Sequence, residues 1–216
     1  MKLFIVRHGE TEWNTEGRFQ GQIDTHLNQN GEKQADLVAE RLKDIKFKCI
    51  FTSHLQRAFY TASEINKKSC SDRLIIDDRI IEINHGEWEG LLSTEIDSKW
   101  PGMLNMWHNL PHEVKMPGEK GESLNDIAER VVPFVESLFN SFEDDDNVLI
   151  VSHDAVIKVL FCYVIGTPLS NFWKFQIPNC SISIIEKNKG RNSRIILLSD
   201  ANHINTTFNR SEQKGL

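Results

Sequence analysis

The sequence lacks long hydrophobic runs, is poor in cysteine and carries no excess of positive charge. The longest apolar stretch, from Ala155 to Gly166, contains Lys158 and is too short to cross a membrane. The first apolar run, Leu3 to Val6, is too short for the core of a signal peptide. A formal net charge of −6 argues against general binding to nucleic acid. We therefore expect a cytoplasmic protein without nucleic-acid or membrane partners, in which any anion is bound by a local cluster of cations.

The cysteines are scattered along the chain. None of them forms a CxxC pair or has the spacing of zinc ligands, so the sequence predicts reduced thiols that mostly fill the core. They are Cys49, Cys70, Cys162 and Cys180.

Short apolar runs alternate with segments of helical spacing, which is typical of an α/β fold with a mostly parallel sheet. Asn28 is placed to cap the first long helix, and Ser123 with Asp126 forms a capping-box pattern before another. The expected strands are residues 2–6, 49–51, 147–151, 181–186 and 194–198. The expected helices are residues 32–45, 55–67, 123–142 and 155–165.

Polar residues follow three of the expected strands. The first strand runs into Arg7-His8-Gly9, the second is followed within a few residues by Arg57, and a later one runs into Ser152-His153-Asp154. In an open α/β sheet, ligands bind beyond the carboxyl ends of the strands. The sequence could therefore bring two arginines and two histidines to one edge of the sheet.

Each of these motifs also has a simpler interpretation when it is taken alone. Arg7 and His8 can be a surface pair, Arg57 can be solvated on a helix face, and His153 can be a structural histidine. Their shared position at strand ends favours the functional interpretation.

Two arginines and two histidines suit the chemistry of phosphate esters. Guanidinium groups match pairs of phosphate oxygens, and Gly9 would let the backbone approach the anion closely. A neutral histidine nitrogen is a nucleophile, and neighbouring arginines should lower its pKa and keep it neutral near pH 7. The pattern predicts phosphoryl transfer through a phosphohistidine, in which arginines neutralise charge and neither a metal nor another cofactor is required.

Such a reaction also needs a proton donor for the leaving oxygen. The segment from Ile81 to Gly90 offers Glu82, Glu87 and Glu89, and Glu82 follows an apolar run that suggests a strand end. A phosphate dianion beside this carboxyl would raise its pKa, which suits a general acid. Composition alone does not separate this role from that of ordinary loop charges.

Together these residues resemble the signature of the histidine phosphatase superfamily, in its phosphoglycerate-mutase-like branch. The match runs in order from about residue 2 to residue 186, which makes it far more specific than a lone Arg-His-Gly. The motifs that carry it are Arg7-His8-Gly9-Glu10-Thr11 with Trp13-Asn14, Arg18-Phe19-Gln20-Gly21, Leu27-Asn28, Ser53 through Ala58, Glu82 through Gly90, Gly121-Glu122-Ser123 and Val151-Ser152-His153.

The resemblance implies a three-layer α/β/α sandwich with a central, mostly parallel sheet. It also implies a single catalytic domain over residues 1–200, within which residues 91–122 form an insertion that covers the substrate. Residues 201–216 would be a polar C-terminal tail that frays.

The resemblance assigns a role to each matching residue. It makes His8 the nucleophile that accepts the phosphoryl group. Glu82 would protonate the leaving group and then activate the water that hydrolyses phosphohistidine. Arg7, Arg57 and His153 would hold the phosphate oxygens.

The remaining binding residues come from loops and from the position after the second histidine. Asn14 and the Gln20-Gly21 loop would contact the phosphate or the rest of the substrate. Asp154 departs from the family pattern, which most often has glycine there. Because its carboxylate would repel phosphate, we expect Asp154 to turn away and cap the helix that begins at Ala155.

Three functions remain open, and a phosphatase is favoured. The run Gly86-Glu87-Trp88-Glu89-Gly90 and the short connection to Ser123 resemble the phosphatase arm, and a shorter cover would admit water. The enzyme alternative is a 2,3-bisphosphoglycerate-dependent phosphoglycerate mutase. A non-catalytic phosphate-binding module ranks low because both His8 and Glu82 are present.

The sequence describes the substrate only as a small phosphorylated metabolite. Residues 101–121 and 19–25 should contact its organic part. Their aromatic and histidine side chains would suit a sugar phosphate, phosphoserine, a nucleotide-like phosphate or a cobamide precursor. Simple packing over the sheet is an equally good interpretation of the apolar members. An exposed edge strand would allow a homodimer.

Overall fold

A six-stranded sheet runs through the middle of the protein, in the order β3-β2-β4-β1-β5-β6. The strands are β1 Lys2–Arg7, β2 Cys49–Thr52, β3 Leu74–Ile76, β4 Asn147–Ser152, β5 Ile182–Glu186 and β6 Arg194–Asp200. The first four pair in parallel with one another, whereas β5 and β6 run antiparallel to their neighbours. The computed structural model describes residues 1–69, 71 and 73–204.

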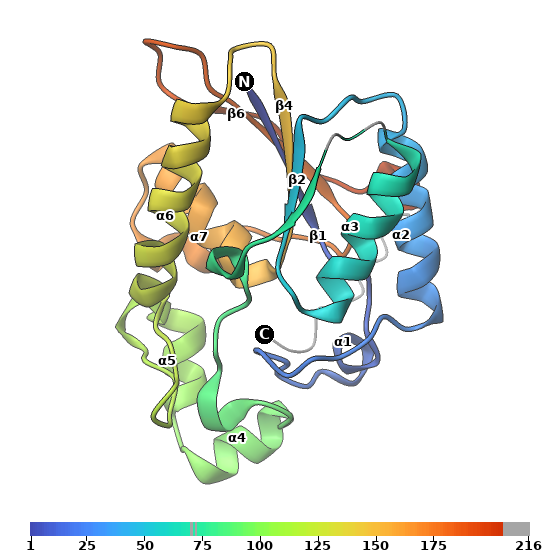
Figure 1. Cartoon of the computed structure of the whole chain (residues 1–216). Coiled ribbons are helices and arrows are strands. Elements are labelled where there is room, and N and C mark those ends of the chain that lie inside the picture. The colour runs from blue at the N-terminus through green and yellow to red at the C-terminus, as the bar shows by residue number, and fades with distance from the viewer. Residues whose placement is uncertain (70, 72, 205–216) are drawn as a thin grey trace.

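Helices cover both faces of this sheet, and the predicted three-layer α/β/α sandwich with a mostly parallel sheet is confirmed (Figure 1). On one face lie α2 Gln29–Leu42 and α3 Gln56–Lys68, and on the other lie α6 Leu124–Ser141 and α7 Asp154–Ile165. The shorter helices are α1 Glu12–Glu16, α4 Ser93–Lys99 and α5 Met103–Asn109. Short 3₁₀ helices occur at Asp78–Ile80, Gly86–Trp88, Pro111–Glu113, Leu169–Lys174 and Asn202–Ile204.

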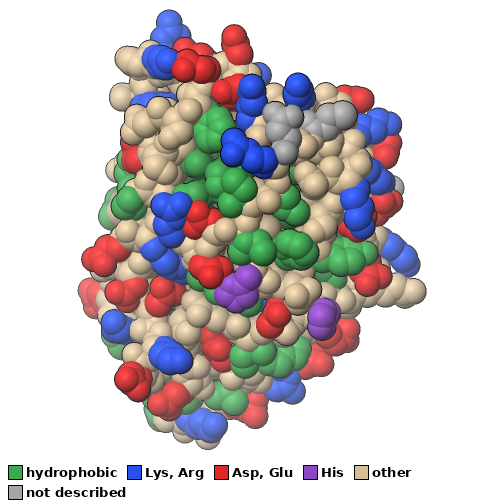
Figure 2. Space-filling model, in the orientation of Figure 1, with side chains coloured by type: hydrophobic (Ala, Val, Ile, Leu, Met, Phe, Trp, Pro, Cys, Tyr) green, Lys and Arg blue, Asp and Glu red, His purple; other side chains and the backbone are tan. Residues whose placement is uncertain are grey.

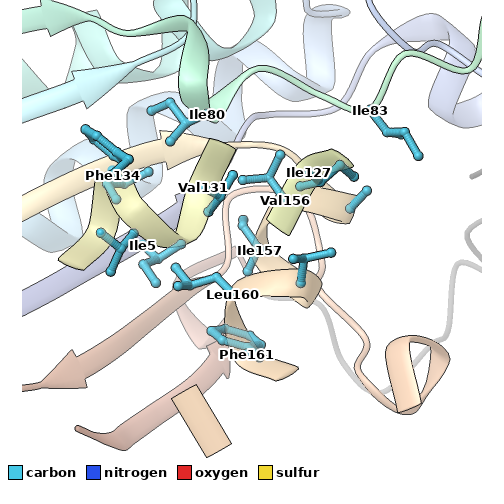
Figure 3. Packing of buried hydrophobic residues seen from close by; sticks show 14 of the residues in the cluster. Ile5, Ile80, Ile83, Ile127, Val131, Phe134, Val156, Ile157, Leu160 and Phe161 are labelled. Carbon is cyan, nitrogen blue, oxygen red and sulfur yellow. The ribbon is translucent and has the colours of Figure 1, made fainter. Parts of the chain in front are cut away.

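The side chains of β1 are apolar on both faces of the sheet. Ile5 joins a buried cluster with Val131 of α6 and Val156 of α7 (Figure 3). Phe4 packs on the opposite face, in the cluster that contains Val38 of α2. Successive residues of a strand point to opposite faces, so a strand covered by helices on both sides must be apolar at consecutive positions. This explains the uninterrupted run that precedes Arg7.

The helix ends carry the local signals expected from the sequence. The Gly31 N–H donates to the Asn28 side-chain oxygen at 2.7 Å, and Ser123 with Asp126 forms a capping box. Gly166 ends α7 with a φ of 66°, a left-handed conformation that glycine adopts without steric cost. Gly166 therefore fixes where α7 stops.

Residues 91–122 contain α4, α5 and a 3₁₀ turn, and this segment is called the cap below. It lies beyond the end of the sheet where β1 and β4 finish (Figure 1). Trp107 of α5 is fully buried and packs its ring 5.6 Å from that of Trp173, which follows α7. The Trp173 indole N–H donates to the Trp107 carbonyl oxygen at 2.6 Å. The cap is therefore joined to the main body through aromatic rings.

Two sequence predictions fall partly outside the described residues. Within the expected polar tail, Asn202–Ile204 form a 3₁₀ turn, and residues 205–216 lie outside the described residues. Cys70 also lies outside them, whereas Cys49, Cys162 and Cys180 are buried free thiols. Within residues 1–69 and 73–204, no helix has the length and apolar character needed to cross a membrane.

Candidate active site

The carboxyl ends of β1 and β4 lie side by side and bring His8 next to His153. The parallel register places Arg7 opposite Ser152, and the His8 N–H donates to the Ser152 carbonyl oxygen at 3.0 Å. The two imidazole rings are buried, with their centroids 5.1 Å apart. Two histidines that are far apart in the sequence therefore meet at one edge of the sheet.

Hydrogen bonding to the backbone fixes the ring of His8. Its Nδ1 lies 2.7 Å from the carbonyl oxygen of Gly9, which can only accept, so Nδ1 carries the proton. The neutral ring then has its lone pair on Nε2. Burial lowers the pKa of His8 well below its ordinary value, and the charges of Arg57 and Arg7 lower it further. The predicted direction is therefore correct, but burial contributes more than the arginines.

Arg57 connects the start of α3 to the loop that follows α1. Its terminal nitrogens donate to the carbonyl oxygens of Gly21 at 2.6 Å and Ile23 at 2.9 Å. Burial lowers its pKa to about 10. A Cβ at Gly21 would lie 2.0 Å from the Glu89 carboxylate, and the φ of this residue is +52°, so the loop requires glycine here.

Arg7 is the last residue of β1 and is almost completely buried. One terminal nitrogen donates to the Ile177 carbonyl oxygen at 2.6 Å and lies 3.5 Å from a carboxylate oxygen of Asp154. The Nε–H groups of Arg7 and Arg57 are both buried without a hydrogen-bond partner among the described residues. Buried donors of this kind are normally satisfied, so two unpartnered Nε–H groups near His8 indicate room for an acceptor.

His153 occupies the N-cap position of α7 without a side-chain capping hydrogen bond. Its Nε2 lies 2.7 Å from the hydroxyl oxygen of Ser53, and its Nδ1 is buried without a partner among the described residues. Burial lowers its pKa well below the ordinary value, with further contributions from Arg57, His8 and Arg7. Ser53 belongs to the second arginine motif of the sequence, and the structure gives it a defined task, which is to hold the second histidine.

Glu82 follows the 3₁₀ helix Asp78–Ile80 and is 4% exposed. One carboxylate oxygen accepts from the N–H groups of Ile83 at 3.0 Å and Ala155 at 3.3 Å. Burial raises its pKa, and the nearby charge of Asp154 adds to the rise. The residues Arg7, His8, Arg57, Glu82 and His153 together form what we call the strand-end cluster.

The prediction that Asp154 caps α7 is wrong. The capping position of α7 is occupied by His153, and Asp154 is the first residue of the helix itself. Its side chain is fully buried and pairs with Lys158 at 2.6 Å and with Arg7 at 3.5 Å. Two buried cations attract the carboxylate more strongly than a helix end would, which is why it does not cap.

Asn14 and Gln20 use their side-chain oxygens within the surrounding loop. The Asn14 oxygen accepts from the Thr11 N–H at 3.1 Å as part of a capping box. The Gln20 oxygen accepts from the hydroxyls of Thr11 at 2.9 Å and Thr25 at 2.7 Å. Contacts of Asn14, Gln20 and Gly21 with a substrate remain predictions.

Sequence reasoning missed three residues that support the strand-end cluster. The Asn179 side-chain N–H donates to the His8 carbonyl oxygen at 2.9 Å. His85 is buried against Phe19, and burial lowers its pKa to about 3. Lys158 was the only basic residue in an apolar helix, four positions after Asp154, and this spacing was a signal for an ion pair. Asn179 and His85 had no comparable signal.

The charged side chains within the strand-end cluster are buried, unlike the mixed charges on the protein surface. On the face shown in Figure 2, acidic and basic side chains are interspersed, so neither sign dominates there. The two arginines of the cluster, by contrast, are buried at 1% exposure each. Anion binding would therefore depend on this internal cluster, as the negative net charge already suggested. In the described part of the chain, no three His, Cys, Asp or Glu side chains gather in a metal-binding arrangement.

Comparison with known proteins gives a consistent family. The chain matches the model of the histidine phosphatase superfamily (branch 1) over residues 3–200. It is 39% identical to phosphoserine phosphatase 1 of Hydrogenobacter thermophilus over 89% of both chains. It is 34% identical to the probable phosphoglycerate mutase GpmB of Escherichia coli O1:K1, over 86% of this chain and 85% of that protein.

A solved structure supports the same assignment. Bacillus stearothermophilus YhfR superposes with a TM-score of 0.86 at 32% identity, covering 94% of this chain and 98% of that chain. The strand-end cluster, the sheet topology and the match along nearly the whole sequence agree. The chain belongs to the histidine phosphatase superfamily, branch 1.

Proposed function

We propose that this protein is a metal-independent phosphomonoesterase that hydrolyses a small phosphorylated metabolite through a phosphohistidine at His8. The observation that carries the proposal is the neutral, oriented ring of His8 beside two buried guanidinium Nε–H groups without a partner among the described residues. Such donors fit phosphate oxygens, and a neutral imidazole fits the phosphorus atom. The relative named phosphoserine phosphatase supports hydrolysis as the outcome.

The first step transfers the phosphoryl group to the protein. The Nε2 lone pair of His8 forms a bond to phosphorus while the bond from phosphorus to the leaving oxygen breaks. Arg7 and Arg57 hold the phosphoryl oxygens through their free N–H groups, and His153 completes the pocket. The two guanidinium charges stabilise the negative charge on the transferring group.

Glu82 moves the protons in both steps. Its raised pKa favours the carboxylic acid, which donates its proton to the leaving oxygen. The resulting carboxylate accepts a proton from the water that attacks phosphohistidine. Phosphate leaves, and His8 and protonated Glu82 are restored.

The cap and the loop that follows α1 are proposed to select the organic part of the substrate. Arg57 holds this loop through Gly21 and Ile23, so recognition of the substrate and of the phosphate meet at one side chain. In the cap, Trp107 lies 6.1 Å from the ring of His85, just beyond Glu82 in the sequence. The cap and this loop would therefore distinguish substrates by the shape of their organic part, and the strand-end cluster would bind the phosphate that all of them share.

A phosphoglycerate mutase is the second candidate, because one relative carries the name probable phosphoglycerate mutase. A mutase would have to return the phosphoryl group to a second oxygen of the substrate before water reaches it. The short cap favours hydrolysis instead.

Phosphate release from a panel of monoesters tests the proposal. The panel contains phosphoserine, 3-phosphoglycerate, sugar phosphates, a nucleoside monophosphate and an aryl phosphate, each with and without a chelator. We expect release from at least one alkyl monoester, undiminished by the chelator. Absence of release from every ester would contradict a phosphatase, and transfer between the 2 and 3 positions of glycerate that outpaces release would favour the mutase.

A further inference from the structure

A buried row of charges adjoins the strand-end cluster at Arg7. Lys158 Nζ lies 2.6 Å from one carboxylate oxygen of Asp154, and the other carboxylate oxygen lies 3.5 Å from Arg7. Asp154 is 0% exposed and Lys158 is 2% exposed. Buried ion pairs rarely add net stability, because desolvation offsets their attraction. A contribution to stability therefore does not explain why these charged residues are buried here.

Aromatic rings fix the ammonium end of this row. Lys158 Nζ lies 4.4 Å from the centre of the Trp173 ring and 5.0 Å from that of Phe172. The faces of both rings attract a cation, and the spacing of four residues on α7 directs the side chain back to Asp154. Lys158 thus has a defined position at the carboxylate oxygen of Asp154 that does not face Arg7.

The carboxylate of Asp154 lies close to the proton donor. Glu82 accepts from the N–H of Ala155, so its carboxyl group rests against the first turn of α7, next to the residue that starts the helix. Two carboxylates in one buried region repel each other when both are ionised. A proton on Glu82 removes that repulsion.

Other charges around Glu82 act in the opposite direction. Arg7 from β1 and Arg57 from α3 favour its ionised form, and so does the ammonium group of Lys158 on α7. Arg130 from α6 donates to the Glu82 carbonyl oxygen at 3.2 Å. The N–H groups of Ile83 and Ala155 also favour the carboxylate. Among the charged groups around Glu82 in the described structure, Asp154 is the one that favours the protonated form, together with burial.

We propose that Asp154 and Lys158 are positioning residues for the reaction: Asp154 keeps the proton on Glu82, and Lys158 offsets the negative charge that Asp154 brings near the phosphate. This inference rests on the proposed phosphatase function and goes beyond it, because it explains why this chain places a carboxylate directly after His153. The two residues act through Glu82 and Arg7 and do not contact the reacting atoms.

The proposal predicts opposite effects for the two members of one ion pair. In Asp154→Asn, Glu82 loses its proton more easily. In the pH profile of kcat/KM for an alkyl phosphate, the alkaline limb, where activity falls at high pH, should therefore move to lower pH by about one unit. In Lys158→Met, Asp154 loses the nearer of its two cations and keeps only Arg7. The alkaline limb should then move up, and the KM for the same substrate should rise by about threefold or more.

Matched variants separate this effect from damage to the fold. Lys158→Met retains the apolar stem that packs on Trp173 and Phe172. The double variant Asp154→Asn/Lys158→Met removes both charges of the Asp154–Lys158 pair together. The alkaline limb of the double variant should lie at or below that of the wild type. Lys43→Met, which removes an exposed ion pair with Glu40, should leave the profile unchanged.

The outcomes distinguish this inference from the proposed function. A wild-type protein that hydrolyses no monoester would overturn the phosphatase itself. An active wild type whose two single variants shift the limb in the same direction, or not at all, would overturn the role of Asp154 and Lys158 alone. If Lys158→Met does not fold, the double variant replaces it. An alkaline limb of its kcat/KM profile that lies above that of the wild type would likewise overturn the role of Asp154 and Lys158.

Discussion

The strand-end cluster and the cap are built from different kinds of side chain. The cluster holds buried charges, with Arg7, Arg57 and Glu82 each less than 5% exposed, whereas the cap is attached through Trp107 and its aromatic neighbours. The first gathers around the ends of β1 and β4, with Arg57 from α3 and Glu82 from the loop after a 3₁₀ helix. The second lies in the chain between the 3₁₀ helix Gly86–Trp88 and α6. Rigid strands suit a reaction that needs fixed geometry, and an inserted cap can vary without disturbing it.

This difference predicts which substitutions affect every substrate and which affect only some. A change in the strand-end cluster should slow all monoesters, because all share the phosphoryl group. A change in the cap should alter the ranking of substrates and leave a generic aryl phosphate nearly untouched. The predictions below test that contrast, beginning with the largest effect.

Replacement of the proposed nucleophile should have the largest effect. His8→Ala should lower kcat for every substrate by at least about 10³-fold, because no other group in the cluster is placed to form the covalent intermediate. Steady-state phosphate release measures this loss. His54→Ala is the control, because His54 is half exposed and pairs with Asp78, and it should retain activity within about twofold. Comparable loss in both variants would contradict the assignment.

Removal of the proposed proton donor should discriminate between leaving groups. Glu82→Gln should slow hydrolysis of an alkyl phosphate by about 10²-fold or more, and that of an activated aryl phosphate far less. The ratio of the two kcat/KM values is the measurement. Glu87→Gln, in the same segment but exposed, is the matched control. Equal slowing of both substrates by Glu82→Gln would mean that the residue does not supply the proton.

The buried histidines of the cluster region should make the protein sensitive to mild acid. Burial lowers the pKa of His8, His85 and His153 in the folded state, whereas their unfolded pKa is about 6.5. The unfolded state therefore binds more protons below pH 6.5, and stability is lost as the pH falls through that value. Glu82, whose folded pKa is raised, acts in the opposite direction.

The net expectation is a lower free energy of unfolding at pH 5.5 than at pH 7, with net uptake of protons on unfolding, because three buried histidines outweigh one carboxyl group. Urea unfolding at the two pH values measures both quantities. His85→Asn should take up about one proton fewer. A free energy of unfolding that is the same at pH 7 and pH 5.5 would show that these histidines are not buried in their neutral form.

The cap should give the smallest and most selective effect. Trp107→Phe should change KM for the preferred metabolite by about threefold to tenfold, because the indole packs against His85 and Trp173, while the aryl phosphate should change by less than about twofold. Met106→Ala is the control, because Met106 is its exposed neighbour on α5. Equal changes for all substrates would mean that Trp107 supports the cluster itself and does not select substrates.

The sequence was sufficient to predict that the histidines and Arg7 meet at the strand ends. It was not sufficient to predict the neighbouring groups that contact them. Arg7, His8 and His153 follow apolar strands, and parallel pairing brings such strand ends together in any α/β sheet, so their meeting could be predicted. Asp154 could not be placed, because its position depends on Lys158 and Arg7 across the tertiary structure and not on the helix it begins. Asn179 likewise reaches His8 from a distant loop.

Capture of the covalent intermediate tests the central claim most directly. Wild-type protein is mixed briefly with a phosphate monoester, quenched in alkali, where phosphohistidine survives, and its peptides are analysed by mass spectrometry. The account predicts one phosphoryl group on the imidazole of His8, absent from His8→Ala and lost on treatment with acid. Turnover that continues while the phosphoryl group is found on another residue, or on none, would contradict it.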